Sequence, residues 1–179
     1  MKSFKDKVAV ITGAGSGIGQ ALAVELAKAG AELAISDINE KNVADTAAQC
    51  TALGAKVKHY KLDVGSREAI YSHAAEVMQA FGRVNLVINN AGVAVNATVR
   101  ELSDADFEWL MNINFWGVVH GTRAFLPHLT ASGEGHLVNV SSIFGMIGVP
   151  KQSAYNAAKF AVRGFTESLR QEMVNEGKT

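Results

Sequence analysis

Short runs rich in β-branched residues alternate along the chain with longer stretches of helical periodicity, and this alternation restricts the fold more than any other feature. The runs cover residues 7–12, 31–36, 56–62, 84–89 and 136–141, with helical patterns between them and a last one over 153–175. Such a rhythm is typical of a parallel sheet with crossover helices. Right-handed crossovers then predict a Rossmann-type, doubly wound α/β sheet of strand order 3-2-1-4-5, with a ligand crevice at the carboxyl ends of strands 1 and 4.

Composition favours one soluble domain that acts on a small molecule. The chain has 179 residues, 48% hydrophobic and 19% charged, which is enough for a single domain, residues 1–179, with a real core. Seventeen basic residues balance seventeen acidic ones, so no net field would attract nucleic acid or an anionic membrane. No apolar stretch approaches the length of a membrane span.

The lone cysteine, Cys50, indicates a reducing compartment such as the cytoplasm. It can form no intrachain disulfide, and no second cysteine completes a metal-binding pair. We therefore expect no bound metal, and we interpret Cys50 as a half-buried helix residue.

A glycine-rich turn, Thr12-Gly-Ala-Gly-Ser-Gly-Ile-Gly19, joins the first predicted strand to the first helix. Its bare backbone could approach a pyrophosphate at the helix N-terminus. The spacing is T-G-x-x-x-G-x-G rather than G-x-G-x-x-G, and a tight strand-to-helix turn can require glycine for its geometry alone. The cofactor contacts expected from this turn are Gly13, Ser16, Gly17, Ile18 and Gly19.

Asp37 ends the second predicted strand, where a carboxylate can accept hydrogen bonds from an adenosine ribose. A 2′-phosphate there would meet like-charge repulsion of about 4 kcal/mol per charge pair at about 4 Å, so the position favours NAD over NADP. The alternative is that Asp37 is a solvated cap of the next helix.

Further cofactor contacts are expected where strands 3 and 4 end. Asp63 can hydrogen-bond an adenine amino group while Val64 packs against the ring, although a helix cap is equally compatible with Asp63. The fourth strand closes with Asn-Asn-Ala-Gly at 89–92. Its small residues admit a ligand and its amides can tie strand ends together, so Asn90, Ala91 and Gly92 join the predicted cofactor site.

Tyr155 and Lys159 are four residues apart on the last predicted helix, so they share a face. The Lys159 ammonium would favour the phenolate of Tyr155, which makes the phenol a usable acid or base. Ser142, thirteen residues before Tyr155, could polarise a substrate carbonyl oxygen. Taken singly, a Tyr-x-x-x-Lys pair is more often a helix-surface pair, so the interpretation depends on the joint order and spacing of the motifs.

In that order and spacing the motifs resemble those of the short-chain dehydrogenase/reductase family, and the resemblance covers essentially the whole chain. The matching positions are 12–19, Asp63, 89–92, Asn114, Ser142, Tyr155 and Lys159. The resemblance implies an NAD-dependent oxidoreductase that exchanges hydride between nicotinamide and a secondary alcohol or ketone without a metal.

The resemblance also implies a role for each residue of the site. Tyr155 would be the general acid/base, and Ser142 would position the substrate oxygen. Lys159 would stabilise the phenolate and bind the nicotinamide ribose. Tyr155 would also contact the cofactor there. Asn114 would hold a water of the proton relay, whereas its position alone indicates only a mid-helix polar residue that bends the fourth crossover.

The chain ends at Thr179, soon after the helix with Tyr155, whereas family members continue through two more strands. We therefore expect a fold that lacks the family's last two strands. Two hypotheses stay open: an NAD-dependent alcohol dehydrogenase or ketone reductase, and a non-catalytic dinucleotide-binding or interaction protein on a shortened fold.

Two apolar features have open interpretations. The loop after Ser142 suggests an apolar substrate wall, although core packing explains its residues equally well. Helices 104–129 and 153–175 resemble the pair through which family members form homodimers or homotetramers, and exposed aromatic residues there would support such an assembly, with burial inside the subunit as the alternative. The residues concerned are Ile143, Phe144, Met146, Ile147 and Val149 in the loop, and Phe107, Trp109, Phe115 and Trp116 in the helices.

Overall fold

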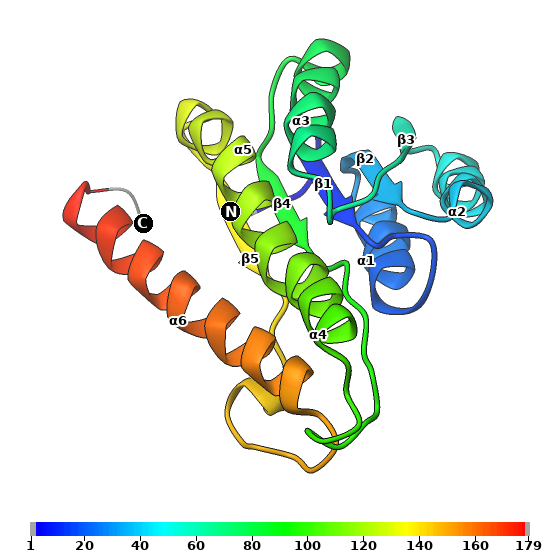
Figure 1. Ribbon diagram of the computed structural model, residues 1–179. Coiled ribbons are helices and arrows are strands. Elements are labelled where there is room, and N and C mark those ends of the chain that lie inside the picture. The colour runs from blue at the N-terminus through cyan, green and yellow to red at the C-terminus, as the bar shows by residue number, and fades with distance from the viewer. Residues whose placement is uncertain (1–2, 178–179) are drawn as a thin grey trace.

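The computed structural model describes residues 3–177. It contains a five-stranded parallel sheet with flanking helices (Figure 1). The strand order is β3-β2-β1-β4-β5, which confirms the predicted order. The strands are β1 (Val8–Thr12), β2 (Glu32–Asp37), β3 (Val57–Lys61), β4 (Leu86–Asn89) and β5 (His136–Asn139). The helices are α1 (Gly17–Lys28), α2 (Glu40–Ala52), α3 (Arg67–Phe81), α4 (Asp104–Met111), α5 (Gly117–Ala131) and α6 (Ser153–Asn175), with a π-helical turn η1 (Asn112–Trp116) and a 3₁₀ turn η2 (Ile143–Gly145).

Helices cover both faces of the sheet (Figure 1). On one face, α1 and α2 pack against the strands through an apolar cluster that includes Leu26 and Val43. On the other, α3 and α5 do so through a cluster that includes Val77 and Phe125. Burial of each such side chain contributes about 1.5–3 kcal/mol. Cys50 on α2 is fully buried rather than half-buried, because its face of the helix packs into the first cluster.

Polar side chains define where the helices begin. Asn39, Ser66 and Ser103 precede α2, α3 and α4, and each accepts a hydrogen bond from the backbone N–H three residues later. Gly82 ends α3 with a φ of 72°, in the left-handed region that favours glycine.

The carboxyl ends of the strands meet at one edge of the sheet. Thr12 lies beside Ser36, and Asn89 lies beside Asn139. The predicted runs extend one or two residues beyond the strands, at 136–141 for example, because β5 loses its neighbour where β4 ends at Asn89. The loops that leave this edge therefore converge on the crevice predicted there.

A third apolar cluster joins α4 to the first half of α6, orange in Figure 1. Leu110, Ala154 and Ala158 form its buried centre, and Phe107 and Phe115 pack against it. Trp109 and Trp116 are instead about half exposed. Of the two alternatives left open for these aromatic residues, packing within the subunit thus holds for the two phenylalanines and exposure for the two tryptophans. Within residues 3–177, no helix has both the length and the apolar character needed to cross a membrane.

Candidate active site

The glycine-rich turn approaches the loop after β4 so closely that side chains would not fit. Gly13 has a φ of 67°, and a Cβ added to it would lie 2.7 Å from the Cα of Ala91. A Cβ on Gly19 would lie 2.1 Å from the carbonyl oxygen of Gly13, so Gly19 is needed for helix packing. Gly17 has a φ of 54° and faces open space at the N-terminus of α1. The turn therefore leaves bare backbone accessible at a helix N-terminus.

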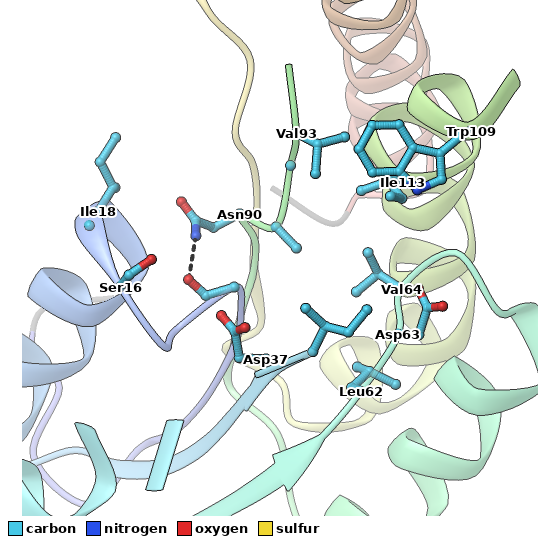
Figure 2. Close-up of a pocket in the computed structure, with 15 residues that line it drawn as sticks. Ser16, Ile18, Asp37, Leu62, Asp63, Val64, Asn90, Val93, Trp109 and Ile113 are labelled. Atoms are coloured by element: carbon cyan, nitrogen blue, oxygen red, sulfur yellow. Dashed lines mark hydrogen bonds between the residues drawn. The ribbon is translucent and has the colours of Figure 1, made fainter. Parts of the chain in front are cut away.

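Asn90 fixes this turn to β4. Its amide nitrogen donates to the carbonyl oxygens of Thr12 at 3.0 Å and Gly13 at 3.2 Å, the second of which is dashed in Figure 2. The hydroxyl oxygen of Thr12 in return accepts from the backbone N–H groups of Asn90 and Ala91, each at 3.1 Å. The sequence-based expectation that amides tie the strand ends together is confirmed.

Two aspartates stand where β2 and β3 end. Asp37 accepts hydrogen bonds from the backbone N–H groups of Gly15 and Asn39, both at 2.9 Å. Asp63 accepts one from Gly65 at 2.8 Å. Neither aspartate caps a helix, because Asn39 and Ser66 hold those positions, so the capping alternatives are wrong. Both carboxylates are oriented by backbone donors at the sheet edge.

These elements enclose a groove of about 490 Å³ (Figure 2). Of the predicted cofactor residues, Gly19, Tyr155 and Lys159 are absent from its lining, whereas Ile38, Leu62, Val93, Trp109 and Ile113 line it without having been predicted. The predicted residues that do line it are Gly13, Ser16, Gly17, Ile18, Asp37, Asp63, Val64, Asn90, Ala91 and Gly92. The unpredicted residues are all apolar, and no motif distinguishes them from core residues in the sequence.

Lys159 lies buried beside Tyr155, one turn along α6. Its ammonium nitrogen is 5.5 Å from the centre of the Tyr155 ring and donates to the carbonyl oxygen of Val140 at 2.8 Å. Burial lowers the pKa of Lys159 below its ordinary value. A Cβ on Gly92, which lines the groove, would lie 3.8 Å from this nitrogen. The Tyr155–Lys159 pair therefore adjoins the groove next to Gly92.

Ser142 approaches the same pair through the turn η2. Its hydroxyl oxygen accepts a hydrogen bond from the backbone N–H of Phe144 at 3.2 Å. The Phe144 ring packs edge-on against Tyr155, with ring centres 6.1 Å apart. The structure thus brings Ser142, Tyr155 and Lys159 to one region, and their catalytic roles stay predictions.

Asn114 lies in the π-helical turn between α4 and α5 and is fully buried. Its amide group accepts from the backbone N–H of Val93 at 2.8 Å and donates to the carbonyl oxygen of Val93 at 2.7 Å. These two bonds hold the loop after β4 against the helix. A π-helical turn displaces the regular backbone hydrogen bonds and is frequent at functional sites.

Asn156 is a site residue that sequence analysis missed. It is buried and donates to the carbonyl oxygens of Phe144 at 2.6 Å and Ile147 at 2.8 Å, and it accepts from the N–H of Val149 at 3.0 Å. It therefore fixes the apolar loop after Ser142 to the helix that carries Tyr155. Its position directly after Tyr155 was the one available signal.

In the described part of the chain, no three His, Cys, Asp or Glu side chains gather in a way that could hold a metal ion.

A Rossmann-type sheet with a glycine turn at its switch point and an acidic residue at the end of β2 is typical of dinucleotide-binding folds. A family model described as short chain dehydrogenase matches residues 7–177. The chain belongs to the short chain dehydrogenase family.

Two relatives illustrate the similarity in sequence. The Mycobacterium tuberculosis protein SadH, which by its name is an oxidoreductase, is 59% identical over 174 residues, which are 97% of this chain and 63% of the relative. Human estradiol 17-beta-dehydrogenase 11 is 40% identical over 172 residues, which are 96% of this chain and 57% of the relative. The chain thus spans less than two thirds of the length of either relative.

Solved structures share the fold. A short chain dehydrogenase/reductase from Burkholderia phymatum in complex with NAD has a TM-score of 0.96 and 39% identity, and the match covers 99% of this chain and 64% of that one. NAD-bound xylitol dehydrogenase has a TM-score of 0.93 and 31% identity, covering 97% and 67%. A metagenomic short-chain oxidoreductase in complex with NADP has a TM-score of 0.93 and 30% identity, covering 97% and 79%. Similarity in fold therefore does not distinguish the two cofactors.

Proposed function

We propose that the protein is an NAD-dependent dehydrogenase or reductase that acts on secondary alcohols and ketones, with Tyr155 as general acid/base. The observation that carries this proposal is the position of the buried Lys159 ammonium, 5.5 Å from the Tyr155 ring and next to Gly92 at the wall of the groove. A proton-transfer group and a groove of about 490 Å³ are thereby adjacent.

The residues of the groove fit a dinucleotide. Open space over Gly17 at the N-terminus of α1 suits a pyrophosphate, and the Asp37 carboxylate suits the hydroxyls of a ribose. Asp63 and Val64 would hold the adenine, and Gly92 leaves room beside Lys159. When bound, the nicotinamide ring supplies the hydride chemistry that the side chains lack.

The chain itself would move the proton. In alcohol oxidation, the phenolate oxygen of Tyr155 accepts the proton of the substrate hydroxyl, and in ketone reduction the phenol returns it. A positive charge on Lys159 favours the phenolate. Ser142 would donate a hydrogen bond to the substrate oxygen and orient it toward Tyr155.

A preference for NAD over NADP follows from Asp37. Its carboxylate is held toward the groove by two backbone N–H groups, so it would repel a 2′-phosphate bound to the same ribose. Two of the solved structures described above are NAD complexes, and one is an NADP complex.

The substrate that we propose is apolar. Ile143, Met146 and Ile147 are each more than half exposed on the loop after Ser142, which Asn156 fixes beside Tyr155. Exposed apolar side chains gain free energy when a ligand covers them. The name of the human relative, an estradiol dehydrogenase, is consistent with such a substrate.

We further propose a cytoplasmic homodimer or homotetramer. The single buried cysteine, Cys50, suits a reducing compartment. Half-exposed Trp116 and Phe160 on η1 and α6 supply apolar surface for a helix-to-helix interface. Light scattering after size-exclusion chromatography would measure the assembly, and a monomer would contradict it.

The test of function is NADH formation by the purified protein over a panel of apolar secondary alcohols, with Tyr155→Phe as the decisive variant. We expect turnover in the unmutated protein and a loss of at least about a hundredfold in kcat for Tyr155→Phe, because general acid/base catalysis contributes about 10²–10⁴-fold. Calorimetry should show that NAD binding persists in the variant.

A matched control is Tyr71→Phe, which removes a phenolic hydroxyl from an exposed residue of α3 that does not line the groove, and it should leave kcat unchanged. NAD binding without turnover in the unmutated protein would instead support the hypothesis of a non-catalytic dinucleotide-binding protein. Full activity of Tyr155→Phe would exclude Tyr155 as the acid/base.

A further inference from the structure

Trp109 stands at the open rim of the groove without a role in the chemistry proposed above. It is 48% exposed, and it is the single aromatic side chain among the groove-lining residues in the part of the chain that the structure describes. Figure 2 shows its indole beside Ile113, with Val93 and Val64 on the same side of the groove. A large apolar side chain that is half exposed beside a cavity indicates a surface that a ligand can cover.

The helix geometry assigns Trp109 to one end of the groove. Trp109 and Ile113 are four residues apart, so they share a face of the α4–η1 helix, while Leu110 on another face is buried against α6. The side-chain amide of Asn112 donates to the carbonyl oxygen of Gly65 at 2.9 Å. This bond ties the helix to the segment that follows β3, so Trp109 lies at the Asp63–Val64 end.

Exposed apolar side chains from two other elements complete the rim. Ile18 on α1 is 66% exposed, and Ile38 after β2 is 63% exposed, and both line the groove. Between them lie the open backbone at Gly17 and the Asp37 carboxylate, which suit a phosphate and a ribose. The part of a dinucleotide that remains for an apolar end of the groove is the flat purine base.

We propose that Trp109 is a purine-contact residue, which closes the adenine end of the groove and covers the base from the α4–η1 side. The inference rests on the proposed function, because it takes the groove to be a dinucleotide site. Aromatic contact with a base strengthens binding by about tenfold or more when judged by alanine substitution. Trp109 is therefore a positioning residue for the cofactor that does not touch the reacting atoms.

With this role, Trp109 differs from Asp37 in how its loss affects the choice between NAD and NADP. A base contact is common to NAD, NADP and ADP, so loss of Trp109 weakens all three by a similar factor. Loss of Asp37 changes the ratio of NAD to NADP, because that carboxylate acts at the 2′-position.

The chain has two tryptophans, and the second supplies a matched control. Trp116 is 47% exposed, close to the value for Trp109, but it stacks on His120 with ring centres 5.7 Å apart and does not line the groove. Trp116→Phe leaves Trp109 as the sole tryptophan, and Trp109→Phe leaves Trp116. Titration with ADP should change tryptophan fluorescence in the first variant and leave it unchanged in the second.

Affinity is measured by calorimetry with NAD and ADP on the full purified protein. We expect Trp109→Ala to raise both dissociation constants by about tenfold or more, Trp109→Phe to restore most of the affinity, and Trp116→Ala to leave both within about twofold. Thermal unfolding of each variant checks the fold. If Trp109→Ala does not fold, the comparison uses Trp109→Phe, which keeps an aromatic ring.

Two outcomes would overturn the inference, and they are distinguishable. If the unmutated protein binds NAD, and Trp109→Ala binds NAD and ADP as tightly as the unmutated protein does, the proposed function stands and Trp109 has no contact with the base. A lower oligomeric mass for Trp109→Ala with unchanged dissociation constants would assign the tryptophan to an interface instead, which also overturns the inference. If the unmutated protein binds neither NAD nor NADP, the proposed function fails first, and the inference falls with it.

Discussion

The backbone N–H of Gly15 donates a hydrogen bond to the Asp37 carboxylate at 2.9 Å, and this contact links the glycine-rich turn to the end of β2. A second backbone donor, Asn39, holds the other carboxylate oxygen at 2.9 Å. The ribose-binding carboxylate that we propose is therefore oriented before any ligand arrives. Preorganisation of this kind lowers the ordering cost of binding.

Gly15→Ala should weaken NAD binding through Asp37. An added Cβ would lie 2.8 Å from the Asp37 carboxyl carbon and 3.0 Å from the Cβ of Asn42, so the carboxylate must move. Because the displaced group is the end of a side chain, we expect a small change in stability and a rise of about tenfold in the NAD dissociation constant, on the order of 1.4 kcal/mol. Calorimetry measures it.

The control for this variant is Gly164→Ala on α6, where an added Cβ meets nothing within 4 Å. It should keep NAD affinity and stabilise the helix slightly, since alanine is preferred to glycine there by about 1 kcal/mol. Equal affinities of the two variants for NAD would show that the Gly15–Asp37 contact does not shape the site.

Asp37→Asn should narrow the preference for NAD over NADP. The substitution removes a negative charge whose repulsion of a 2′-phosphate is worth about 4 kcal/mol at about 4 Å in a shielded setting, and less where water screens it. We expect the ratio of kcat/KM for the two cofactors to fall by at least about tenfold. Asp45→Asn, which removes a carboxylate paired with Lys41 on the outer side of α2, should leave the ratio as it was. An unchanged ratio in Asp37→Asn would refute the assignment.

The strand order was predictable because each run of β-branched residues is followed by a helix, and right-handed crossovers allow few arrangements of such units. The same pattern is enough to place Thr12, Asp37 and Asn89 at one edge of the sheet, because each of them ends a strand that runs in the same direction. Strand ends were less predictable, since pairing stops where a neighbouring strand departs, as β5 shows beyond Asn139.

Site residues that act through tertiary contacts were not predictable. Asn156 bonds to backbone groups of a loop seven to twelve residues earlier, and such partners leave no periodic trace in the sequence. Trp109 differs from a core residue of α4 by its exposure at the groove, which a helical pattern does not encode. Asn114 was reached through family resemblance alone, because the π-helical turn that carries it has no sequence signature.

Asn156→Ala should loosen the substrate loop while sparing the cofactor site. It removes the two part-buried hydrogen bonds to the carbonyl oxygens of Phe144 and Ile147, and a hydrogen bond of this kind contributes about 0.5–1.5 kcal/mol. We expect a lower melting temperature and a higher KM for the alcohol, with the NAD dissociation constant unchanged. Asn175→Ala, at the exposed end of α6, controls for loss of an asparagine from the same helix. A variant with normal KM would show that Asn156 only stabilises the fold.

His73 should make the fold sensitive to mild acid. It lies in the core between Tyr60 and Phe125, with ring centres 4.6 and 6.0 Å away, and within residues 3–177 neither ring nitrogen has a hydrogen-bond partner. Burial lowers its pKa from 6.5 to about 4. Between about pH 6.5 and about pH 4 the unfolded chain therefore binds the proton more readily than the folded one, so the free energy of unfolding decreases as the pH falls through this window.

The difference between the two pKa values corresponds to a loss on the order of 3 kcal/mol across that window. His73→Leu should remove most of this loss, because leucine keeps the site apolar and cannot titrate. Urea unfolding at about pH 7 and about pH 5 would compare the two proteins, with His59→Gln, a substitution on the exposed edge strand β3, as the control that retains the loss. Equal pH dependence in His73→Leu and the unmutated protein would assign the acid sensitivity to other groups.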